Sequence, residues 1–474
     1  MTGPGESTPH PAAATYSPRL RTALVLTGTG TAGAYHAGAL RALHEAGVKI
    51  DVVGGQGIGA VGALFAAVDG AQKLWDEKGF WSAAAVRGFY PWRRTLRLAA
   101  GAIAASIGIV LLPIAVMALG LVVYPIDFVA RMLGLGGTGG LVTPYLQFVQ
   151  VAFASEGFPT WLPRLVVLVL GAVALFALID GWLGRGDRRQ RGPFWWRSLK
   201  APLSSAETVE HCWRVLWDLV RGAAQLRQPT PLELGRRYTE VIADNLGQPG
   251  FRELVLTAHD VDARRDLVFA LVAESRRRAL IRRGTSEAAD ARRADVFDLS
   301  GVARVYLPGA VAGALAVSGV CEPERLTFEP DAYWRGETHR LCDRPASVAR
   351  LIEEVAGLGA EQIIVVSSAP DTHGPHALSP PRLDGRGRFG EYLQSSEAAA
   401  VRDATTQSAR FIQIYPIRPF HNPIGPFDFR GGFDDRSDRS QPLEELMARG
   451  YEDAYRQFVE PVVGASGELL RVTT

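Results

Sequence analysis

Residues 24–67 read LVLTGTGTAGAYHAGALRALHEAGVKIDVVGGQGIGAVGALFAA, and this stretch contains two glycine-rich turns. The first turn, from Gly28 to Gly33, follows an apolar run and precedes residues with helical spacing. The second turn, from Gly55 to Gly59, has the same setting. Glycine has no Cβ, so it tolerates tight turns and lets the backbone come close to a neighbour or a ligand. The stretch therefore predicts two successive strand–turn–helix units.

Strands and helices alternate along the rest of the chain. Short apolar runs predict strands at residues 23–27, 49–53, 253–258, 266–272, 362–366 and 410–417. Helical spacing predicts helices at residues 34–46, 59–68, 231–246, 346–356 and 441–459. Strands separated by helices favour a parallel sheet covered on both faces, so we expect an α/β protein.

The first glycine turn alone fits more than one kind of site. A helix N-terminus with unpaired N–H groups can bind a dinucleotide phosphate or stabilise an oxyanion, and the same glycines also occur in purely structural turns. A dinucleotide site needs an acidic residue at the end of the second strand. Asp51 has about the right separation but begins that strand, which argues against nucleotide binding.

Together the two turns resemble the start of the patatin-like phospholipase family. That family has a GGGxRGxYxxG run and then a serine in GxSxG at a nucleophile elbow; here the two runs read GTGTAGAYHAG and GQGIG. The resemblance is strong over residues 20–70 and weaker over residues 234–272, 307–328 and 346–368. It implies a patatin-like three-layer sandwich whose ligand or substrate is a lipid.

The sequence departs from the family where the family performs its chemistry. Gly57 stands at the position of the nucleophilic serine, and Thr29 and Ala32 replace a glycine and an arginine of the oxyanion run. The family's aspartate lies in a DGG or DGA triplet; the corresponding place here reads YWRGE, which puts Arg335 at the acid position. Because glycine supplies no nucleophile, the resemblance implies a fold kept without its serine–aspartate dyad.

Composition excludes several other classes of function. The 474 residues include 51 basic and 49 acidic ones, so no overall field draws the chain to nucleic acid. Cys212, Cys321 and Cys342 are far apart and odd in number, which argues against a disulfide framework or a zinc site and fits a reducing compartment. The acidic cluster at residues 434–438 lacks EF-hand spacing. We expect neither a metal nor another cofactor.

Two apolar runs predict membrane helices. Residues 98–126 contain no charged residue, and about 20 apolar residues suffice for a helix to span a bilayer. Residues 165–184 form the second run, with Asp180 near its end and with Trp161 and Trp182 placed as in an aromatic belt. Soluble helices rarely stay apolar on every side over such a length. The sequence predicts an inserted two-helix transmembrane hairpin; two buried core helices are the alternative.

The basic residues around this hairpin predict its orientation. Arg93, Arg94 and Arg97 precede the first run and residues 185–200 are rich in arginine, whereas residues 127–163 contain Arg131 as their sole base. By the positive-inside rule, both ends of the hairpin are cytoplasmic. We expect an integral protein of the cytoplasmic membrane whose globular part lies in the cytoplasm.

These features divide the chain into five segments. Residues 1–19 have no apolar core of signal-peptide length and are expected to form a disordered leader. The other segments are a first patatin-like part at 20–92, the hairpin insertion at 93–200, a second patatin-like part at 201–370 and a C-terminal extension at 371–474.

The leading functional hypothesis is a membrane-anchored pseudoenzyme that binds a lipid or a protein partner at the cytoplasmic face. Backbone N–H groups in its turns would still point toward a headgroup phosphate or an acyl carbonyl, although the glycines could also serve packing alone. These positions are Gly28, Thr29, Gly30 and Gly33 in the first turn, and Gly55, Gln56, Gly57, Ile58 and Gly59 in the elbow.

Two alternatives remain. The chain could be an active lipid acyl hydrolase with relocated catalytic residues, drawn from the hydroxyls Ser318, Ser367 and Ser368 and the carboxylates Asp331 and Asp343. It could also be a bilayer scaffold or channel-like assembly, because an acidic residue within an apolar run is often functional. Asp180 lies close to the end of its run, which favours a simple interfacial position.

Overall fold

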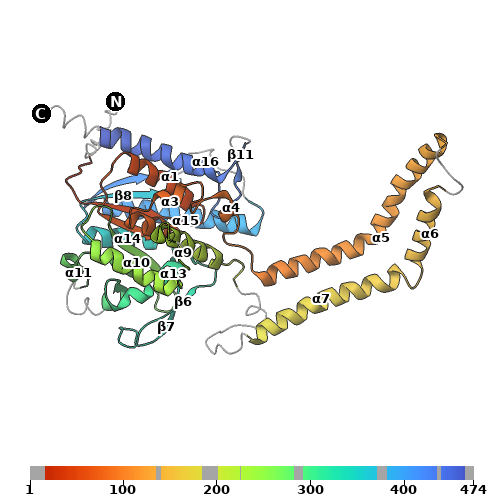
Figure 1. The fold of residues 1–474 in the computed structure, drawn as a ribbon, viewed down its shortest axis with the longest axis horizontal. Helices are drawn as coiled ribbons and strands as arrows, with labels where there is room; N and C mark the ends of the chain where they lie inside the picture. The colour runs from red at the N-terminus through yellow and green to blue at the C-terminus, as the bar shows by residue number, and fades with distance from the viewer. Residues whose placement is uncertain are drawn as a thin grey trace, which may run out of the picture. The chain divides into compact units, whose positions relative to one another are not determined.

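The computed structural model describes residues 16–134, 140–183, 201–224, 226–281, 292–370, 382–434 and 439–464. The chain divides into two compact units. Unit 1 comprises Met1–Pro91 and Leu203–Thr474 and contains both glycine turns, and unit 2 comprises Trp92–Pro202 and contains the long apolar helices. Figure 1 shows both units in one ribbon.

Unit 1 is built around a nine-stranded sheet of described residues with the order β5-β4-β3-β2-β1-β8-β9, and β7 pairs with β3 and with β6. The strands are β1 Thr22–Thr27, β2 Val52–Gln56, β3 Glu253–Asp260, β4 Arg265–Leu271, β5 Val296–Asp298, β6 Glu324–Thr327, β7 Thr338–Cys342, β8 Gln362–Ser367 and β9 Gln413–Ile417. Neighbours from β3 through β2, β1 and β8 to β9 are parallel, while β4 and β7 are antiparallel to β3. The predicted α/β class with a largely parallel sheet is confirmed.

Helices cover both faces of this sheet. Alternate residues of β1 face opposite ways, because successive side chains of a strand do so: Leu24 and Leu26 belong to one core, and Ala23 and Val25 belong to the other. The first core contains residues of α1 Ala32–Glu45, α2 Gly59–Ala67, α9 Ala206–Arg221, α10 Pro231–Asn245, α13 Leu307–Leu315 and α16 Leu443–Ala454. The second contains residues of α11 Glu274–Ile281, α14 Ser347–Gly357 and α15 Gly385–Ser408.

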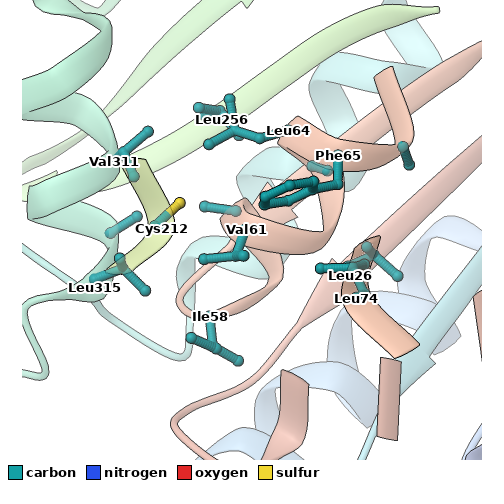
Figure 2. Close-up of a cluster of buried hydrophobic side chains, with 14 of the residues drawn as sticks. Leu26, Ile58, Val61, Leu64, Phe65, Leu74, Cys212, Leu256, Val311 and Leu315 are labelled. Carbon is teal, nitrogen blue, oxygen red and sulfur yellow. The ribbon is translucent and has the colours of Figure 1, made fainter. Parts of the chain in front are cut away.

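The helix that follows the second glycine turn lies in the middle of the first core. Every residue of α2 is buried, and Figure 2 shows Val61, Leu64 and Phe65 of this helix among Leu256 of β3 and Val311 of α13. A helix that is apolar on all sides must be enclosed by protein or lipid. The enclosure fixes the start of α2, and therefore the position of the elbow.

The C-terminal part is integrated into unit 1 rather than appended to it. Strand β9 pairs in parallel with β8, and α16 crosses α1 so closely that a Cβ on Gly38 would lie 1.8 Å from the carbonyl oxygen of Met447. At the other end, residues 16–19 were assigned to the leader, yet Tyr16 is buried with its ring 5.5 Å from that of Phe458. Residues 1–15 of that leader lie outside the described residues.

Unit 2 consists of α5 Arg94–Met132, α6 Val142–Phe153 and α7 Phe158–Leu183. Helices α5 and α7 pack against each other, as the hairpin prediction requires (Figure 1). Two segments, Arg94–Met132 and Phe158–Ile179, are long and apolar enough to cross a membrane. Within the apolar 18-residue stretch of each helix, 17% of the residues in α5 and none of those in α7 are buried inside the protein. Every residue of the apolar helix α2, by contrast, is buried. Helix α6 was not predicted, and residues 184–200 with their bases lie outside the described residues.

Candidate functional site

Both glycine turns lie at the same edge of the sheet. Strands β1 and β2 are parallel neighbours, so their carboxyl ends at Thr27 and Gln56 lie side by side and lead directly into the two turns. Ligand sites of open α/β sheets form at such an edge. The two turns that the sequence predicted separately therefore lie next to each other.

The elbow has no room for a side chain at its central position. Gly57 has a φ of +60°, which L-residues with a side chain rarely adopt. A Cβ built on Gly57 would lie 2.2 Å from the carbonyl oxygen of Gly28 and 2.9 Å from Oδ2 of Asp343. The same Gly28 oxygen accepts a hydrogen bond from Ile58 N–H at 2.9 Å. The first turn thus fills the space in which a nucleophile would stand.

A carboxylate does face this position, and it belongs to Asp343. Asp343 follows β7 directly and is only 3% exposed. Its Oδ2 accepts a hydrogen bond from Thr29 Oγ1 at 3.2 Å, and its Oδ1 accepts one from the amide of Gln56. Gln56 in turn accepts a bond from the hydroxyl of Thr27. Burial raises the pKa of Asp343 to about 7, although the bonds from Gln56 and Thr29 favour its charged form.

A second buried carboxylate lies on the other side of the first turn. Glu397 of α15 is 4% exposed, and a Cβ on Gly28 would lie 2.9 Å from its Oε1. The carboxylate accepts hydrogen bonds from Ser367 Oγ at 2.7 Å and from the backbone N–H of Thr29. Burial raises the pKa of Glu397 to about 8, and the negative charge of Asp343 raises it further while Ser367 lowers it. Two buried acids with raised pKa values therefore lie beside Gly28 and Thr29.

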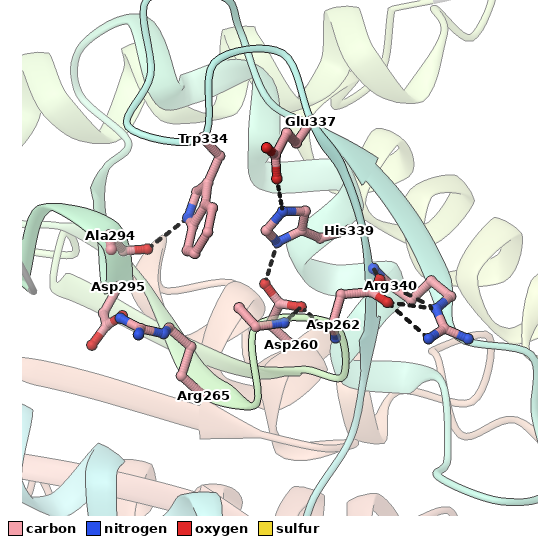
Figure 3. A network of polar contacts seen from close by, with 10 residues as sticks. Asp260, Asp262, Arg265, Ala294, Asp295, Trp334, Glu337, His339 and Arg340 are labelled. Atoms are coloured by element: carbon pink, nitrogen blue, oxygen red, sulfur yellow. Dashed lines mark hydrogen bonds and ion pairs between the residues drawn. The ribbon is translucent and has the colours of Figure 1, made fainter. Parts of the chain in front are cut away.

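The structure does not bring Arg335 to this site. Arg335 is exposed and has a φ of +45° in the loop between β6 and β7, which Figure 3 shows tied down by polar contacts. His339 Nδ1 lies 2.5 Å from Oδ2 of the buried Asp260 at the end of β3, and its Nε2 lies 3.2 Å from Glu337. Trp334 donates to Ala294. The expected acid position thus falls on an anchored surface loop, while Asp343 faces Gly57.

The one DGA triplet of the chain is equally remote from the elbow. It begins at Asp69, just after α2, whereas the elbow lies just before the start of that helix. Asp69 has a φ of +51° and pairs with Arg252 at 3.0 Å. Its backbone strain and its ion pair describe a turn that closes the end of α2.

The N-terminus of α1, expected to bind a headgroup, is covered by the chain itself. The Pro426 carbonyl accepts a hydrogen bond from Thr31 N–H at 2.9 Å, and the Gly425 carbonyl accepts one from the Thr31 hydroxyl at 2.9 Å. A Cβ on Gly30 would lie 1.9 Å from the Pro426 oxygen, and one on Gly33 would meet the ring of Trp81 at 2.2 Å. In this structure Gly30 and Gly33 permit close packing, which was the alternative to ligand binding.

The other hydroxyls and carboxylates named from the sequence lie elsewhere. Ser318 is half-buried in the turn after α13, and Asp331 is exposed in the β6–β7 loop. The Ser368 carbonyl accepts a bond from the side chain of Asn422. Asp435 and Asp438 of the acidic cluster lie outside the described residues, as does the side chain of Asp180. No group of three potential metal ligands is found in the part of the chain that the structure describes.

The sequence patterns predicted neither Glu397 as a site residue nor the hydrogen bond from Gln56 to Asp343. Glu397 lies one helical turn from Leu393 and one from Val401, both buried, so the spacing placed an acid on a buried helix face. Such an acid is costly unless it is hydrogen-bonded or protonated. That signal could have identified Glu397, but nothing local in the sequence could have paired it with Gly28.

One family model and several known proteins show similarity to this chain. Residues 24–160 match the family model for patatin-like phospholipase. A stretch of 45 residues is 58% identical to patatin-like phospholipase domain-containing protein 6 of Mus musculus and, equally, of Homo sapiens. It covers 9% of this chain and spans 3% of the length of those relatives. The crystal structure of VipD from Legionella pneumophila aligns at 10% identity and a TM-score of 0.31, over 95% of this chain and 67% of that one.

Proposed function

We propose, from the patatin-like phospholipase domain that this chain carries, that it is a membrane-anchored member of that family without hydrolase activity. The observation that carries the proposal is the position of the Gly28 carbonyl, 2.2 Å from where a Cβ of residue 57 would be. The reaction of a serine–aspartate dyad needs a hydroxyl at that position and free N–H donors beside it. This elbow has no hydroxyl at residue 57, and its Ile58 N–H is bonded to the Gly28 carbonyl.

In this proposal the protein keeps the acid of the dyad and lacks only the nucleophile. Asp343 takes the acid position, because its carboxylate is the one that faces Gly57. In such a dyad the aspartate accepts the proton of the nucleophile, and Gly57 carries no side chain that could serve as that nucleophile. Asp343 instead binds Thr29 and Gln56, so it holds the two glycine turns together.

Helices α5 and α7 serve as the membrane anchor. Most of their apolar side chains are not covered by other parts of the protein. An exposed apolar surface along helices of this length is stable in lipid rather than in water. Arginine precedes α5 and follows α7, so the positive-inside rule places unit 1 in the cytoplasm. Without hydrolase activity, the chain would bind a lipid or a protein partner at the cytoplasmic face of the membrane.

A second candidate function is lipid acyl hydrolysis by relocated residues. It is favoured by two pairs in which a hydroxyl donates to a buried carboxylate: Thr29 to Asp343 at 3.2 Å, and Ser367 to Glu397 at 2.7 Å. A carboxylate whose pKa lies near neutrality suits a general base. Both hydroxyls are buried, at 3% and 0% exposure, so a substrate would reach them only if the covering segment around Pro426 moved.

Three measurements on the full chain test these alternatives. Membranes washed with alkaline carbonate should retain the protein, and its release would remove the anchor from the proposal. The protein purified in detergent should not hydrolyse nitrophenyl esters or phospholipids above a blank. A fluorophosphonate probe should leave it unlabelled; labelling at Thr29 or Ser367 that is lost in Thr29→Val or Ser367→Ala would establish the hydrolase instead.

A further inference from the structure

We propose that the tip of unit 2 contains a binding site for the phosphate of a phospholipid headgroup, with Arg131 as the residue that binds the anion. The inference rests on the proposed function, because it takes α5 and α7 to span a bilayer. It concerns the end of the hairpin remote in sequence from unit 1, where α5 ends and α6 begins.

Near the tip, the described parts of α5 and α6 pack against each other. Helix α6 packs against α5 through Tyr145, which is buried and donates from its hydroxyl to the Val116 carbonyl at 3.0 Å. Gly120 leaves space for this ring, since a Cβ there would lie 2.7 Å from the tyrosine oxygen. The ring of Tyr124 meets that of Tyr145 edge-on, with centroids 6.0 Å apart. Contacts of this kind hold α6 at one position along α5.

Asp127 fixes the orientation of Arg131. The carboxylate of Asp127 is almost buried; one oxygen accepts from Leu141 N–H at 2.6 Å, and the other lies 2.7 Å from Nε of Arg131. Gly140 lets the chain pass this carboxylate, because a Cβ there would lie 1.9 Å from its Oδ1. The ion pair engages Nε of the guanidinium, which has five N–H donors in a fixed fork. The side chain of Arg131 stays 57% exposed, so its terminal nitrogens can accept a ligand.

A cleft of about 640 Å³ opens beside this guanidinium. It is lined by Tyr124, Pro125, Asp127, Phe128, Arg131 and Val142. The lining combines aromatic rings with one cation, a combination typical of the boundary between hydrocarbon and headgroups. Arginine matches the planar face of a phosphate with two parallel hydrogen bonds. The cleft can therefore take the glycerol end of a lipid while Arg131 binds its phosphate.

The position along α5 places Arg131 at headgroup depth. From Leu98, where the apolar run begins, to Arg131 a straight helix would measure about 50 Å, whereas a bilayer with its headgroups measures about 40–45 Å. Pro113 lies inside α5 and permits the kink that shortens this span. Arg131 thus reaches the headgroup layer at the end of the span opposite Leu98. It is also the sole base in residues 98–163, so no other cation of that stretch competes for the phosphate.

The test uses the full chain in a neutral detergent, with lipid retention measured by native mass spectrometry. The probes are dihexanoyl phosphatidylglycerol, the matching diacylglycerol without phosphate, and inorganic phosphate. The wild type should retain the phosphatidylglycerol and not the diacylglycerol, and equimolar inorganic phosphate should not displace the lipid. Equal retention of both lipids, or displacement by inorganic phosphate, would overturn the assignment to a headgroup phosphate.

Two variants and one control locate the site. Arg131→Gln should weaken retention of phosphatidylglycerol by about tenfold. Val142→Trp should do so as well by filling the cleft while leaving the arginine in place. Arg164→Gln is the control, since Arg164 is also exposed in unit 2 but does not line the cleft. Unchanged retention in both cleft variants, or an equal loss in the control, would overturn the site. Carbonate extraction of the wild type reports separately on the anchor.

Discussion

The backbone carbonyl of Gly28 accepts a hydrogen bond from Ile58 N–H at 2.9 Å, and this bond joins the two glycine turns. Ile58 directly follows the elbow position, and in a nucleophile elbow the N–H at that place belongs to the oxyanion hole. The chain therefore satisfies, with its own backbone, a donor that a hydrolase keeps for its substrate. The absence of a side chain at Gly57 and the occupied Ile58 N–H therefore occur at the same turn.

Gly57→Ser should destabilise unit 1 and create no hydrolase activity. The serine needs a Cβ within 2.2 Å of the Gly28 oxygen at a φ of +60°, so either the backbone or the first turn must shift. Strain of this kind costs about 1–3 kcal/mol, and overpacking in a closed core adds a similar amount. Thermal unfolding of the detergent-purified protein and an ester hydrolysis assay check the two expectations.

The matched control for that substitution is Gly47→Ser. Gly47 has a φ of +65°, and a Cβ there would meet nothing within 4 Å. It therefore carries the backbone strain without the collision, and should cost about 1 kcal/mol. Equal losses of stability in the two variants would show that the Gly28 carbonyl does not close the elbow. Ester hydrolysis by Gly57→Ser would show that the site opens on its own.

Glu397→Gln should flatten the dependence of stability on pH. The pKa of Glu397 is about 8 in the folded protein and its ordinary value is 4.5, so the folded state binds the proton more tightly than the unfolded state does. The stability from this group is complete below about pH 4 and is lost as the pH rises toward 8, by up to about 1.4 kcal/mol per unit. Asp343, with a pKa of about 7, contributes a loss of the same sign.

Chemical denaturation of the full chain at intervals between pH 5 and pH 8 measures this effect. The wild type should lose stability over that interval, Glu397→Gln should lose less, and Glu397→Gln with Asp343→Asn least. An exposed acid gives the control: Glu391→Gln, also on α15, should reproduce the wild-type slope. A wild-type stability that rises with pH over this range would contradict the raised pKa values of these two acids.

The sequence predicted the architecture well because the strong signals were local. The strands β1, β3, β4 and β8 are continuous apolar runs, and α2 is apolar on every side, so periodicity and length sufficed. Strands β5, β6 and β7 were missed, since they are three to five residues long and depend on pairing with other strands. Strand β5 pairs with β4, β7 pairs with β3, and β6 pairs with β7. The match of residues 24–160 to the patatin-like model confirms the family resemblance.

The site could be predicted only in part. Gly28, Gly57 and their neighbours were predicted because the spacing of glycines is visible in the sequence itself. The acid position was placed at Arg335, eight residues before Asp343, because the register of a loop and of two short strands decides which residue faces the elbow. The contact of Pro426 with the first turn joins residues about 400 positions apart and has no local signal.

Arg292→Met should destabilise unit 1 strongly. Arg292 and Glu354 are buried, at 7% and 0% exposure, and their side chains form two hydrogen bonds of 3.0 and 2.5 Å. Removal of Arg292 takes one guanidinium away from the buried Glu354, while Arg350 still pairs with it at 2.9 Å. The loss of a buried ion-pair partner costs up to about 3–5 kcal/mol. The double variant Arg292→Met and Glu354→Leu should recover much of this loss. Equal stability of the single and double variants would show that the ion pair is uncoupled.

Leu168→Arg should reduce the share of the protein that resists carbonate extraction. Leu168 lies in the middle of α7 and is 67% exposed. In water this change would be neutral or favourable, because an exposed leucine gains nothing from its surroundings. At the centre of a bilayer, arginine is disfavoured by about 3–4 kcal/mol relative to leucine. Leu226→Arg, an exposed leucine of unit 1, should have no effect. Equal extraction of the two variants would place α7 in water and remove the anchor from the proposed function.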